Sequence, residues 1–442
     1  MAAERRVGIV TVAAALLLGW GALATAGVDI QHWRTESGAR VYFVAADELP
    51  MVDARVVFDA GAARDDGQPG LAVMTNHMLM QGADGLDATE IAARLEDVGA
   101  GVGTGAERDM AWLSLRSLTD PELLEPALDT VASVLGNPDF PPEDLERERA
   151  RTLVALDKQR ESPSEMAQQA LYRAVFRDHP YAHEPLGTAE SVSALTREDL
   201  QQFYRRYYTA ANAVIAIVGD LDRPAAEDLA ERLVAKLEPG EAAAALPEVP
   251  PLRDSAQERI THPSSQSHVR VGQPGIERGA EDYFTLYVGN HALGGGGLVS
   301  LLMEEVREKR GFSYSVYSYF VPMARKGPFV LGMQTRNDQA DEGLEVLRQT
   351  LRQFVEEGIS DEQLERAKKN IVGGFPLRID SNRDMVQYLA AIGFYDLPLD
   401  YIDRFPEEIE AVTREDVQRA FREHVDPERM AVVVVGGNES GE

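Results

Sequence analysis

The feature that most constrains the fold of this chain is a pattern that occurs twice. Residues 196–219 begin with T-R-E-D-L, continue as a predicted helix and end with an apolar strand and a glycine. Residues 413–436 begin with T-R-E-D-V and follow the same course, and both ends are offset by 217 residues (413 − 196 = 436 − 219). A second echo joins L-E-R at 145–147 to L-E-R at 364–366. Two echoes in the same order predict an internal duplication.

The two predicted copies occupy residues 28–237 and 264–438, and the segment between them, 238–263, is rich in Pro, Ala and Glu, as linkers are. Each copy has predicted strands followed by paired helices. The first copy shows strands at 41–44 and 54–58 and amphipathic helices at 88–98, at 122–135 and from 145 onward. The predicted fold class is therefore α+β, with two tandem homologous α/β-sandwich domains whose antiparallel-rich sheets are packed by helices.

Composition excludes several classes of function. A chain of 442 residues is too long for a single core, which supports two domains. The absence of cysteine excludes disulfide scaffolds, cysteine nucleophiles, zinc ribbons and iron–sulfur clusters. With 44 basic and 73 acidic side chains the net charge is −29, which argues against nucleic acid as a partner. That charge has two readings: a solvated acidic surface, or an acidic cavity that attracts basic peptides.

The first 26 residues have the features of a secretory signal. Arg5 and Arg6 precede an apolar stretch from Val7 that closes on A-T-A at 24–26, which predicts cleavage before Gly27. The alternative is an uncleaved membrane anchor, because about 20 apolar residues can just span a bilayer. On either reading the rest of the chain is expected in the periplasm, and it contacts a membrane only if the leader stays attached.

The apolar segment G-L-A-V-M-T-N-H-M-L at 70–79 contains a single histidine. Zinc hydrolases of the inverted type carry H-x-x-E-H on a helix, which gives two imidazole ligands and a water-activating carboxylate on one face. Here Val73 stands at the first histidine position, Asn76 at the glutamate position, and only His77 remains. One imidazole cannot hold a catalytic zinc ion, which takes three protein ligands. His77 alone predicts a satisfied interior histidine.

Other candidate motifs give no site. His179 and His183 are four residues apart, but Pro180 favours a loop over a shared helix face. Glu423-His424 lacks a histidine three residues earlier, where Ala420 stands. The G-x-S-x-G elbow, the P-loop and G-x-G-x-x-G after a strand do not occur. The glycine-rich run at 99–105 has no helix start behind it and predicts a flexible strand or turn.

The segment 293–319 is the most informative stretch. Gly294, Gly295, Gly296 and Gly297 precede a predicted helix at 298–309, and a β-prone run follows at 312–320. Four glycines allow either the close approach of a ligand or a mobile loop, or they form a tight strand-to-helix turn. Arg307 falls in the last turn of the predicted helix, where a cation is favoured in any case. Tyr314 falls early in the strand that follows.

With these segments in order, the chain resembles the pitrilysin/insulinase family of zinc peptidases, in its processing-peptidase-like branch. The resemblance covers essentially the whole mature chain. G-L-A-x-x-x-x-H-M-L is similar to the family's zinc helix, and G-G-G-G-L-V-S-L-L-M-E-E-V-R-E-K-R-G-F-S-Y is similar to its second-domain signature. The family's third zinc ligand is a glutamate eight residues before a proline, and counting back from Pro163 gives Ala155, so that ligand is also replaced.

The resemblance implies the zinc-free subunit of a heteromeric zinc endopeptidase that acts on unfolded peptides. The chain itself would hold no cofactor and would be inactive alone, and Zn²⁺ would be in a homologous partner subunit with an intact H-x-x-E-H. Arg307 and Tyr314 match the family's arginine and tyrosine, which help the active site from the opposite domain, and Gly294–Gly297 resemble a substrate-contacting loop. The alternative is an inert peptide-binding or structural scaffold like the respiratory-complex core proteins.

Overall fold

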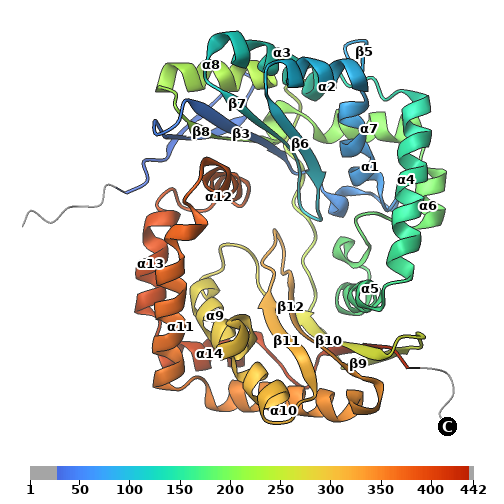
Figure 1. The fold of residues 1–442 in the computed structure, drawn as a ribbon, viewed down its shortest axis with the longest axis vertical. Coiled ribbons are helices and arrows are strands. Elements are labelled where there is room, and N and C mark those ends of the chain that lie inside the picture. Colours follow the sequence, from blue (N-terminus) through green and yellow to red (C-terminus); the bar gives the residue numbers. More distant parts are fainter. Residues whose placement is uncertain (1–26, 438–442) are drawn as a thin grey trace, which may run out of the picture.

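Two halves of matching topology make up the chain, and the computed structural model describes them over residues 27–437 (Figure 1). The predicted leader, 1–26, lies outside the described residues. Within them, no helix has the length and apolar character needed to cross a membrane. The leader and the periplasmic location stay predictions.

The first half is built on a six-stranded sheet in the order β1-β2-β8-β3-β7-β6, in which β2 and β8 are parallel and the other neighbours are antiparallel. Its strands are β1 (Gln31–Arg34), β2 (Arg40–Ala45), β3 (Met51–Phe58), β6 (Gly101–Ala106), β7 (Ala111–Leu118) and β8 (Ala213–Gly219), with a separate two-stranded ribbon of β4 (Gly82–Ala83) and β5 (Leu86–Asp87). Its helices are α1 (Leu71–Met78), α2 (Ala88–Asp97), α3 (Pro121–Gly136), α4 (Pro142–Arg160), α5 (Pro163–Phe176), α6 (Ala189–Ala194), α7 (Arg197–Tyr207) and α8 (Arg223–Val234).

The second half has a five-stranded sheet in the order β9-β13-β10-β12-β11, again with one parallel pair, β9 and β13. Its strands are β9 (Ala256–Ile260), β10 (Gln266–Pro274), β11 (Ser313–Phe320), β12 (Pro328–Arg336) and β13 (Ala431–Val435), and its helices are α9 (Tyr283–Asn290), α10 (Ala340–Glu357), α11 (Asp361–Gly374), α12 (Asn382–Phe394), α13 (Tyr401–Ala411) and α14 (Arg414–His424). In sheet order these strands match β2, β8, β3, β7 and β6. The α+β fold class with two homologous sandwiches is confirmed.

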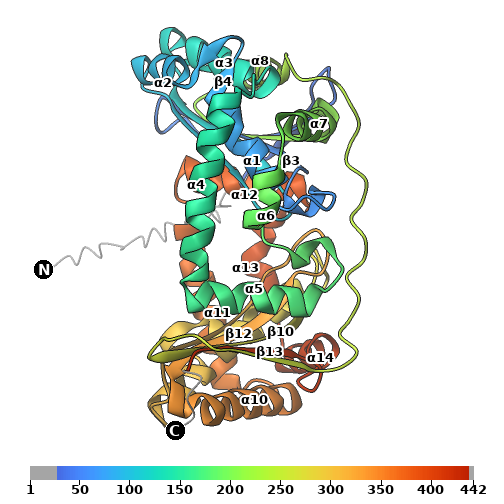
Figure 2. The ribbon, with the colours of Figure 1, turned by 90° about the vertical axis from the view of Figure 1, so that its right-hand side faces the viewer.

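Strand β9 lies inside the segment 238–263, which the sequence predicts as a linker. Its residues, A-Q-E-R-I, are exposed or half-buried at the edge of the sheet, so they carry no apolar run that would mark a strand. The connection between the two sheets therefore ends at residue 255, and the second sheet begins earlier in the chain than its apolar strands indicate. Figure 2 shows the connection running along the outside of the molecule from one half to the other.

The repeated T-R-E-D segments form the same structure in both halves. Thr196 and Thr413 each cap a helix, α7 or α14, by accepting a hydrogen bond from the backbone N–H of the aspartate three residues later, and that aspartate bonds back to the threonine N–H. The strands that follow, β8 (A-V-I-A-I-V-G) and β13 (A-V-V-V-V), are buried at every residue. Continuous apolar runs are typical of strands that are covered on both faces of their sheet.

The second face of each sheet is covered by a helix from the other half (Figures 1 and 2). Helix α5 of the first half packs on β10 and β13, where Leu171, Val175 and Phe176 meet Val433 in one buried cluster. Helix α12 of the second half packs on β3 and β8, where Leu389 meets Val214. Each half therefore completes the core of the other.

Asp109 ties the halves together at a polar junction. It lies in the β6–β7 turn, is 4% exposed and accepts hydrogen bonds from the hydroxyls of Tyr181 (2.5 Å) and Tyr395 (3.0 Å). The backbone N–H of Ala324, in the β11–β12 turn, donates to the same carboxylate at 2.7 Å. Burial raises the pKa of Asp109, and these three donors oppose that rise. One buried carboxylate thus joins a turn of each sheet to the end of the exchanged helix α12.

Candidate functional site

Helix α1 carries the degenerate zinc motif, and its motif positions are packed against neighbouring residues. Its first turn is held by Asp65, whose carboxylate accepts hydrogen bonds from the N–H groups of Gly70 (2.9 Å) and Ala72 (2.8 Å). Asn76 is fully buried and its side-chain amide donates to the Trp112 carbonyl and the Tyr208 hydroxyl, both at 3.2 Å. Val73 is 5% exposed and belongs to the buried part of the helix. The two positions at which the resemblance expects His and Glu are thus filled by packed, non-ligating side chains.

His77 is the half-buried residue of this helix, and among the described residues it belongs to no group of three potential metal ligands. Burial lowers its pKa, and the negative charge of Glu148 on α4 opposes that change. Glu148 itself forms an ion pair with Arg151. Ala155, on the same helix α4, has no ligand atom in its side chain. Val73, Asn76, His77 and Ala155 together offer one imidazole, which does not fit a catalytic zinc ion that needs three protein ligands.

The two histidines after α5 do not form a pair. The imidazole Nε2 of His179 lies 3.0 Å from the Pro247 carbonyl oxygen, and that of His183 lies 3.2 Å from the Ala62 carbonyl oxygen. Residues Pro180–Ala182 form a short 3₁₀ turn between them, as the proline predicts. Each ring is therefore used to hold the backbone of a different loop.

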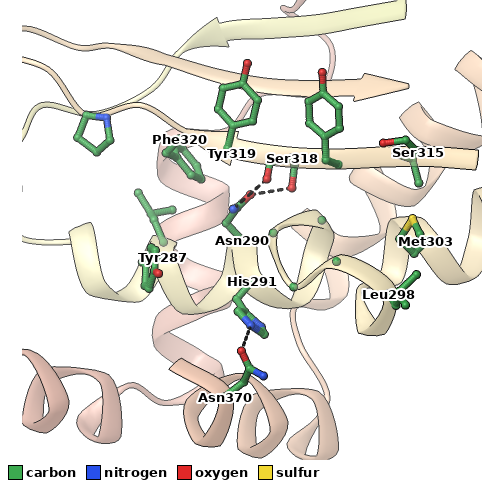
Figure 3. A pocket seen from close by; sticks show the side chains of 18 of the residues that line it. Tyr287, Asn290, His291, Leu298, Met303, Ser315, Ser318, Tyr319, Phe320 and Asn370 are labelled. Atoms are coloured by element: carbon green, nitrogen blue, oxygen red, sulfur yellow. Dashed lines mark hydrogen bonds between the residues drawn. The ribbon is translucent and has the colours of Figure 1, made fainter. Parts of the chain in front are cut away.

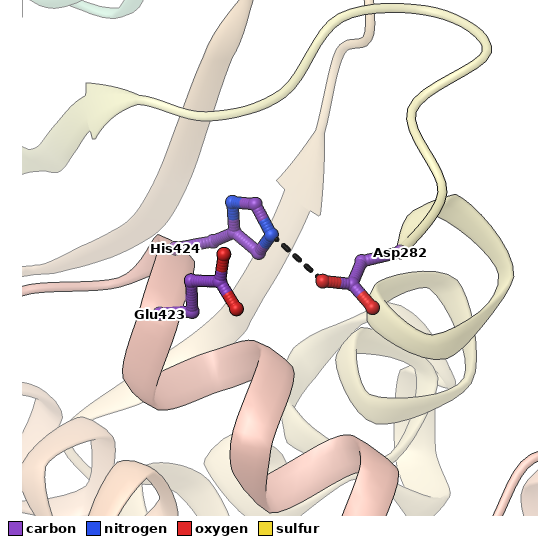
Figure 4. Close-up of side chains that lie close together, drawn as sticks. All are labelled: Asp282, Glu423 and His424. Atoms are coloured by element: carbon purple, nitrogen blue, oxygen red, sulfur yellow. Dashed lines mark hydrogen bonds and ion pairs between the residues drawn. The ribbon is translucent and has the colours of Figure 1, made fainter.

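In the described part of the chain, one group of three side chains has its potential metal ligand atoms within 4.8 Å of one another: Asp282, Glu423 and His424 (Figure 4). The His424 ring lies 3.0 Å from the Asp282 carboxylate. Arg419 donates two hydrogen bonds to Asp282, at 2.7 and 3.1 Å, and lies 3.5 Å from Glu423. Its guanidinium group already neutralises the carboxylates and lowers the pKa of Asp282, so this cluster is an ion-pair network.

The glycine run is the part of the second half that departs most from regular structure. Residues 291–295 form a wide π-type turn, with the N–H of Gly296 donating to the His291 carbonyl at 2.8 Å. A Cβ on Gly294 would lie 2.4 Å from the backbone nitrogen of Ser318, so this position needs glycine for a close backbone approach. Gly297 adopts φ +60°, which also favours glycine. The tight strand-to-helix turn is therefore wrong, because α9 already precedes the run.

The helix predicted at 298–309 is also irregular. It consists of a 3₁₀ turn at Gly297–Val299 and a second π-type turn at Met303–Glu308, which the Lys309 N–H closes onto the Glu304 carbonyl at 3.0 Å. Such wide turns are frequent at functional sites. The β-prone run after it forms β11, the edge strand of the second sheet.

Arg307 and Tyr314, which the resemblance singles out, lie together. The guanidinium carbon of Arg307 sits over the Tyr314 ring, 4.5 Å from its centroid, in a cation–π contact. Tyr314 is 82% exposed although it stands in a strand. Among the described residues, no hydrogen bond or ion pair holds the polar end of either side chain. The pair therefore presents a cation and a phenol to the outside of this chain.

A cavity of about 810 Å³ opens beside this segment, between α9, the glycine run and β11 (Figure 3). Asn290 fixes its centre: its amide donates to the Ser318 carbonyl at 3.1 Å and its oxygen accepts from the Ser318 hydroxyl at 2.7 Å. The His291 ring lies 3.0 Å from the Asn370 side-chain oxygen. Tyr314 and all four glycines line the cavity. The sequence places the glycines here but gives no signal for Asn290, Asn370 or Arg378, which come from other segments.

The net charge of the chain does not describe the lining of this cavity. Its lining contains no aspartate and no glutamate, and it contains Arg278, Arg378 and His291. The acidic excess of the chain therefore lies elsewhere, and a charge summed over 442 residues does not give the sign of a local site.

Comparisons with known proteins agree with the geometry. The family model for the insulinase peptidases (peptidase family M16) matches residues 40–189, and the model for the peptidase M16 inactive domain matches residues 194–371. A crystal structure of a peptidase M16 inactive domain from Pseudomonas fluorescens is similar with a TM-score of 0.90 and 39% identity, covering 94% of this chain and 100% of that one.

Two curated relatives cover most of the chain at lower identity. An uncharacterized zinc protease of Streptomyces coelicolor is 28% identical over 371 residues, which is 81% of this chain and 79% of the relative. The non-peptidase homolog YmxG of Helicobacter pylori is 25% identical over 395 residues, which is 88% of this chain and 89% of the relative. The chain belongs to the insulinase (M16) peptidase family, and with its zinc-ligand positions replaced it is a peptidase-like protein of the family's inactive type.

Proposed function

We propose that this protein is the zinc-free subunit of a heteromeric, periplasmic zinc endopeptidase and that it supplies Arg307 and Tyr314 to the active site of a zinc-bearing homologous subunit. The observation that carries the proposal is the Arg307–Tyr314 pair. Its two polar ends have no partner among the described residues, and Tyr314 is 82% exposed. A cation stacked on an exposed tyrosine at the edge of a cavity is suited to meet groups from outside the chain.

The proposed chemistry is the stabilisation of charge that develops on a peptide bond. In the complex, the partner's zinc site would hydrolyse an unfolded peptide, and the Tyr314 hydroxyl would donate a hydrogen bond to the tetrahedral oxyanion. The Arg307 guanidinium would hold the substrate or the same oxygen. Preorganised donors of this kind contribute about 10²–10³ each to the rate. The cation–π contact would hold both side chains in place before the substrate arrives.

The test is co-expression with a homologous subunit that carries an intact H-x-x-E-H, followed by cleavage of a quenched fluorescent peptide. Tyr314→Phe and Arg307→Ala are each expected to lower kcat by about 10²–10³. Arg310→Ala is the matched control, because Arg310 lies in the same segment but pairs with Glu305 at 2.7 Å. Unchanged cleavage by both variants would contradict the roles assigned to Arg307 and Tyr314. Zinc-dependent cleavage by the purified lone chain would contradict the proposal that this protein is a zinc-free subunit.

A second candidate is the inert scaffold, which the name of the Helicobacter relative, a non-peptidase homolog, favours. The two candidates differ in one observable. A scaffold would be purified without a zinc-bearing homologue and would leave the cleavage rate of any added homologue unchanged.

A further inference from the structure

The cavity beside the glycine run has the opposite charge to the protein that contains it. The chain carries 73 acidic side chains, yet none of those among the described residues lines this cavity, whereas Arg278, Arg378 and His291 do. A volume of about 810 Å³ lies in the range of sites that enclose a ligand. The cavity is therefore a local site for an anion in a protein whose surface as a whole repels one.

The two guanidinium groups have no carboxylate partner among the described residues. Arg378 donates to the Tyr287 hydroxyl at 2.6 Å, and Arg278 donates to the Tyr283 hydroxyl at 3.3 Å. The buried Nε of Arg278 has no hydrogen-bond partner within residues 27–437. Its sequence neighbour Glu277 lies 3.9 Å from Arg325 in an ion pair and does not neutralise it. Because an unpaired charge in a partly buried site is costly, these groups are suited to an external anion.

Both arginines contact tyrosines of helix α9, which forms one wall of the cavity. Tyr283 and Tyr287 stand one turn apart on α9, and their rings are stacked with centroids 6.0 Å apart and an interplanar angle of 15°. Each arginine lies near the face of its own tyrosine, at 5.5 Å for Arg278 and 5.8 Å for Arg378. Arg378 is exposed at the rim, whereas Arg278 is half-buried. The two stacked tyrosines therefore hold two cations, one exposed at the rim of the cavity and one half-buried.

The remaining walls suit an extended chain more than a small inorganic anion. β11 is the edge strand of its sheet, so one side of its backbone has no neighbouring strand. The glycine run brings bare backbone to the opposite side, and apolar side chains including Leu298, Met303 and Phe320 lie along the cavity (Figure 3). Leu298 is 67% exposed at this site. Asn290 and Gly294 occupy this edge at Ser318, and the rest of the strand borders the cavity beside apolar side chains, which suits an extended peptide.

We propose that this cavity binds an extended peptide by a carboxylate, with Arg378 and Arg278 as the groups that select it. The carboxylate is either an acidic side chain or the peptide's own C-terminus, since a guanidinium group binds both in the same way. The inference rests on the proposed function, because it assigns a preference to the peptide-engaging face of the same protein. It adds that the preferred peptides present a carboxylate to this cavity.

The test is binding of fluorescent, unstructured peptides to the purified full chain. Four peptides of one sequence differ only in charge: a central Glu or Gln, each with a free or an amidated C-terminus. A fifth peptide carries Lys at the centre. The peptide with the responsible carboxylate is expected to bind about tenfold tighter than its neutral counterpart, as a charge-assisted hydrogen bond predicts. The Glu and C-terminal arms identify which carboxylate is used.

Arg378→Gln is the main variant because its side chain is exposed and its loss does not disturb the core. It is expected to reduce the preference for the carboxylate to within about twofold. The matched control, Arg366→Gln, removes the same charge from an exposed residue that pairs with Glu362 on α11 and does not line the cavity, so it should keep the full preference. Arg278→Lys keeps the positive charge but loses the planar, two-pronged donor geometry of the guanidinium group. It should therefore keep part of the preference for the carboxylate.

Three results would overturn the proposal. Equal affinity for all four Glu and Gln peptides, with a free or an amidated C-terminus, or tighter binding of the Lys peptide, would overturn the carboxylate preference while leaving peptide binding intact. An unchanged preference in Arg378→Gln would place the selecting group elsewhere. Failure of all five peptides to bind would overturn the inference and the peptide-engaging role together, whereas loss of cleavage without loss of binding would affect only the proposed catalytic role.

Discussion

The helices that follow β3 and β10 occupy equivalent places in the two halves and are used in opposite ways. In the first half, α1 is a regular helix whose motif positions are buried, and Asn76 bonds to Trp112 and Tyr208. In the second half, α9 runs into a π-type turn and a glycine run that leave a cavity beside an exposed tyrosine. The same topology thus supports a filled site and an open one, and a few small residues decide which.

The largest expected effect comes from placing the family's glutamate back into the closed half. Asn76→Glu puts a carboxylate at a fully buried position, and it should lower the free energy of unfolding by about 3–5 kcal/mol. Tyr314→Glu introduces the same group at an 82% exposed position in the open half and should change stability by less than about 1 kcal/mol. Chemical denaturation of both variants measures the contrast, and equal losses would contradict it.

The next effect tests whether the two halves hold each other. Asp109→Ala removes the acceptor of two tyrosine hydroxyls and one backbone N–H, and we expect a loss of about 2–4 kcal/mol. Asp109→Asn keeps the shape of the side chain and one acceptor oxygen, so it should lose less stability than Asp109→Ala. A double-mutant cycle with Tyr395→Phe should give a coupling of roughly 0.5–3 kcal/mol. Additive losses in that cycle would mean that the junction does not connect the halves.

A smaller effect on stability is expected from alanine substitutions in the two glycine-rich runs, 294–297 in the second half and 99–105 in the first. Gly294→Ala would bring a Cβ within 2.4 Å of the Ser318 nitrogen, so we expect a loss of about 1–3 kcal/mol and weaker peptide binding. Gly101→Ala in the first half meets no atom within 4 Å and should change stability by less than about 0.5 kcal/mol. Thermal unfolding of the pair measures this, and a neutral Gly294→Ala would show that the close approach is not required.

The smallest effect concerns pH. Burial lowers the pKa of His291, with Asn370 opposing and the charge of Arg378 adding to the change. Below about pH 6.5 the unfolded chain takes up a proton that the folded state resists, so stability falls as the pH falls. His291→Gln should flatten this fall between pH 7 and 5. His77→Gln should flatten it as well, because burial also lowers the pKa of His77 and Glu148 opposes only part of that change. Identical slopes in all three proteins would contradict the assignment.

Much of the fold could be predicted from the sequence because its signals are local. The T-R-E-D caps and the apolar runs of β8 and β13 carry their own structure, and the duplication places them in equivalent positions. Strand β9 could not be predicted, because its residues face solvent and gain their strand conformation from pairing with β13. The exchange of α5 and α12 was equally hidden, since an amphipathic helix does not reveal which sheet it covers.

The candidate site was predicted in part. The absent zinc ligands and the Arg307–Tyr314 spacing can be read from short motifs, and the structure places that pair in contact. The cavity itself depends on groups far apart in the chain, such as Asn290 and Asn370, and on a π-type turn that no periodicity indicates. The positive lining of the cavity could not be predicted from composition, because the net charge is a sum over the whole chain.

The exchange of helices also bears on how such a chain could arise. Each half contributes α5 or α12 to the other half's sheet, which is the arrangement of a two-fold dimer whose subunits swap one helix. Fusing two copies through an outer connection would convert that symmetric dimer into one chain with the same contacts. Once the copies are joined, each is free to diverge without losing its partner. A gene duplication that kept the swap would thus let one copy lose its metal while the other acquired a cavity.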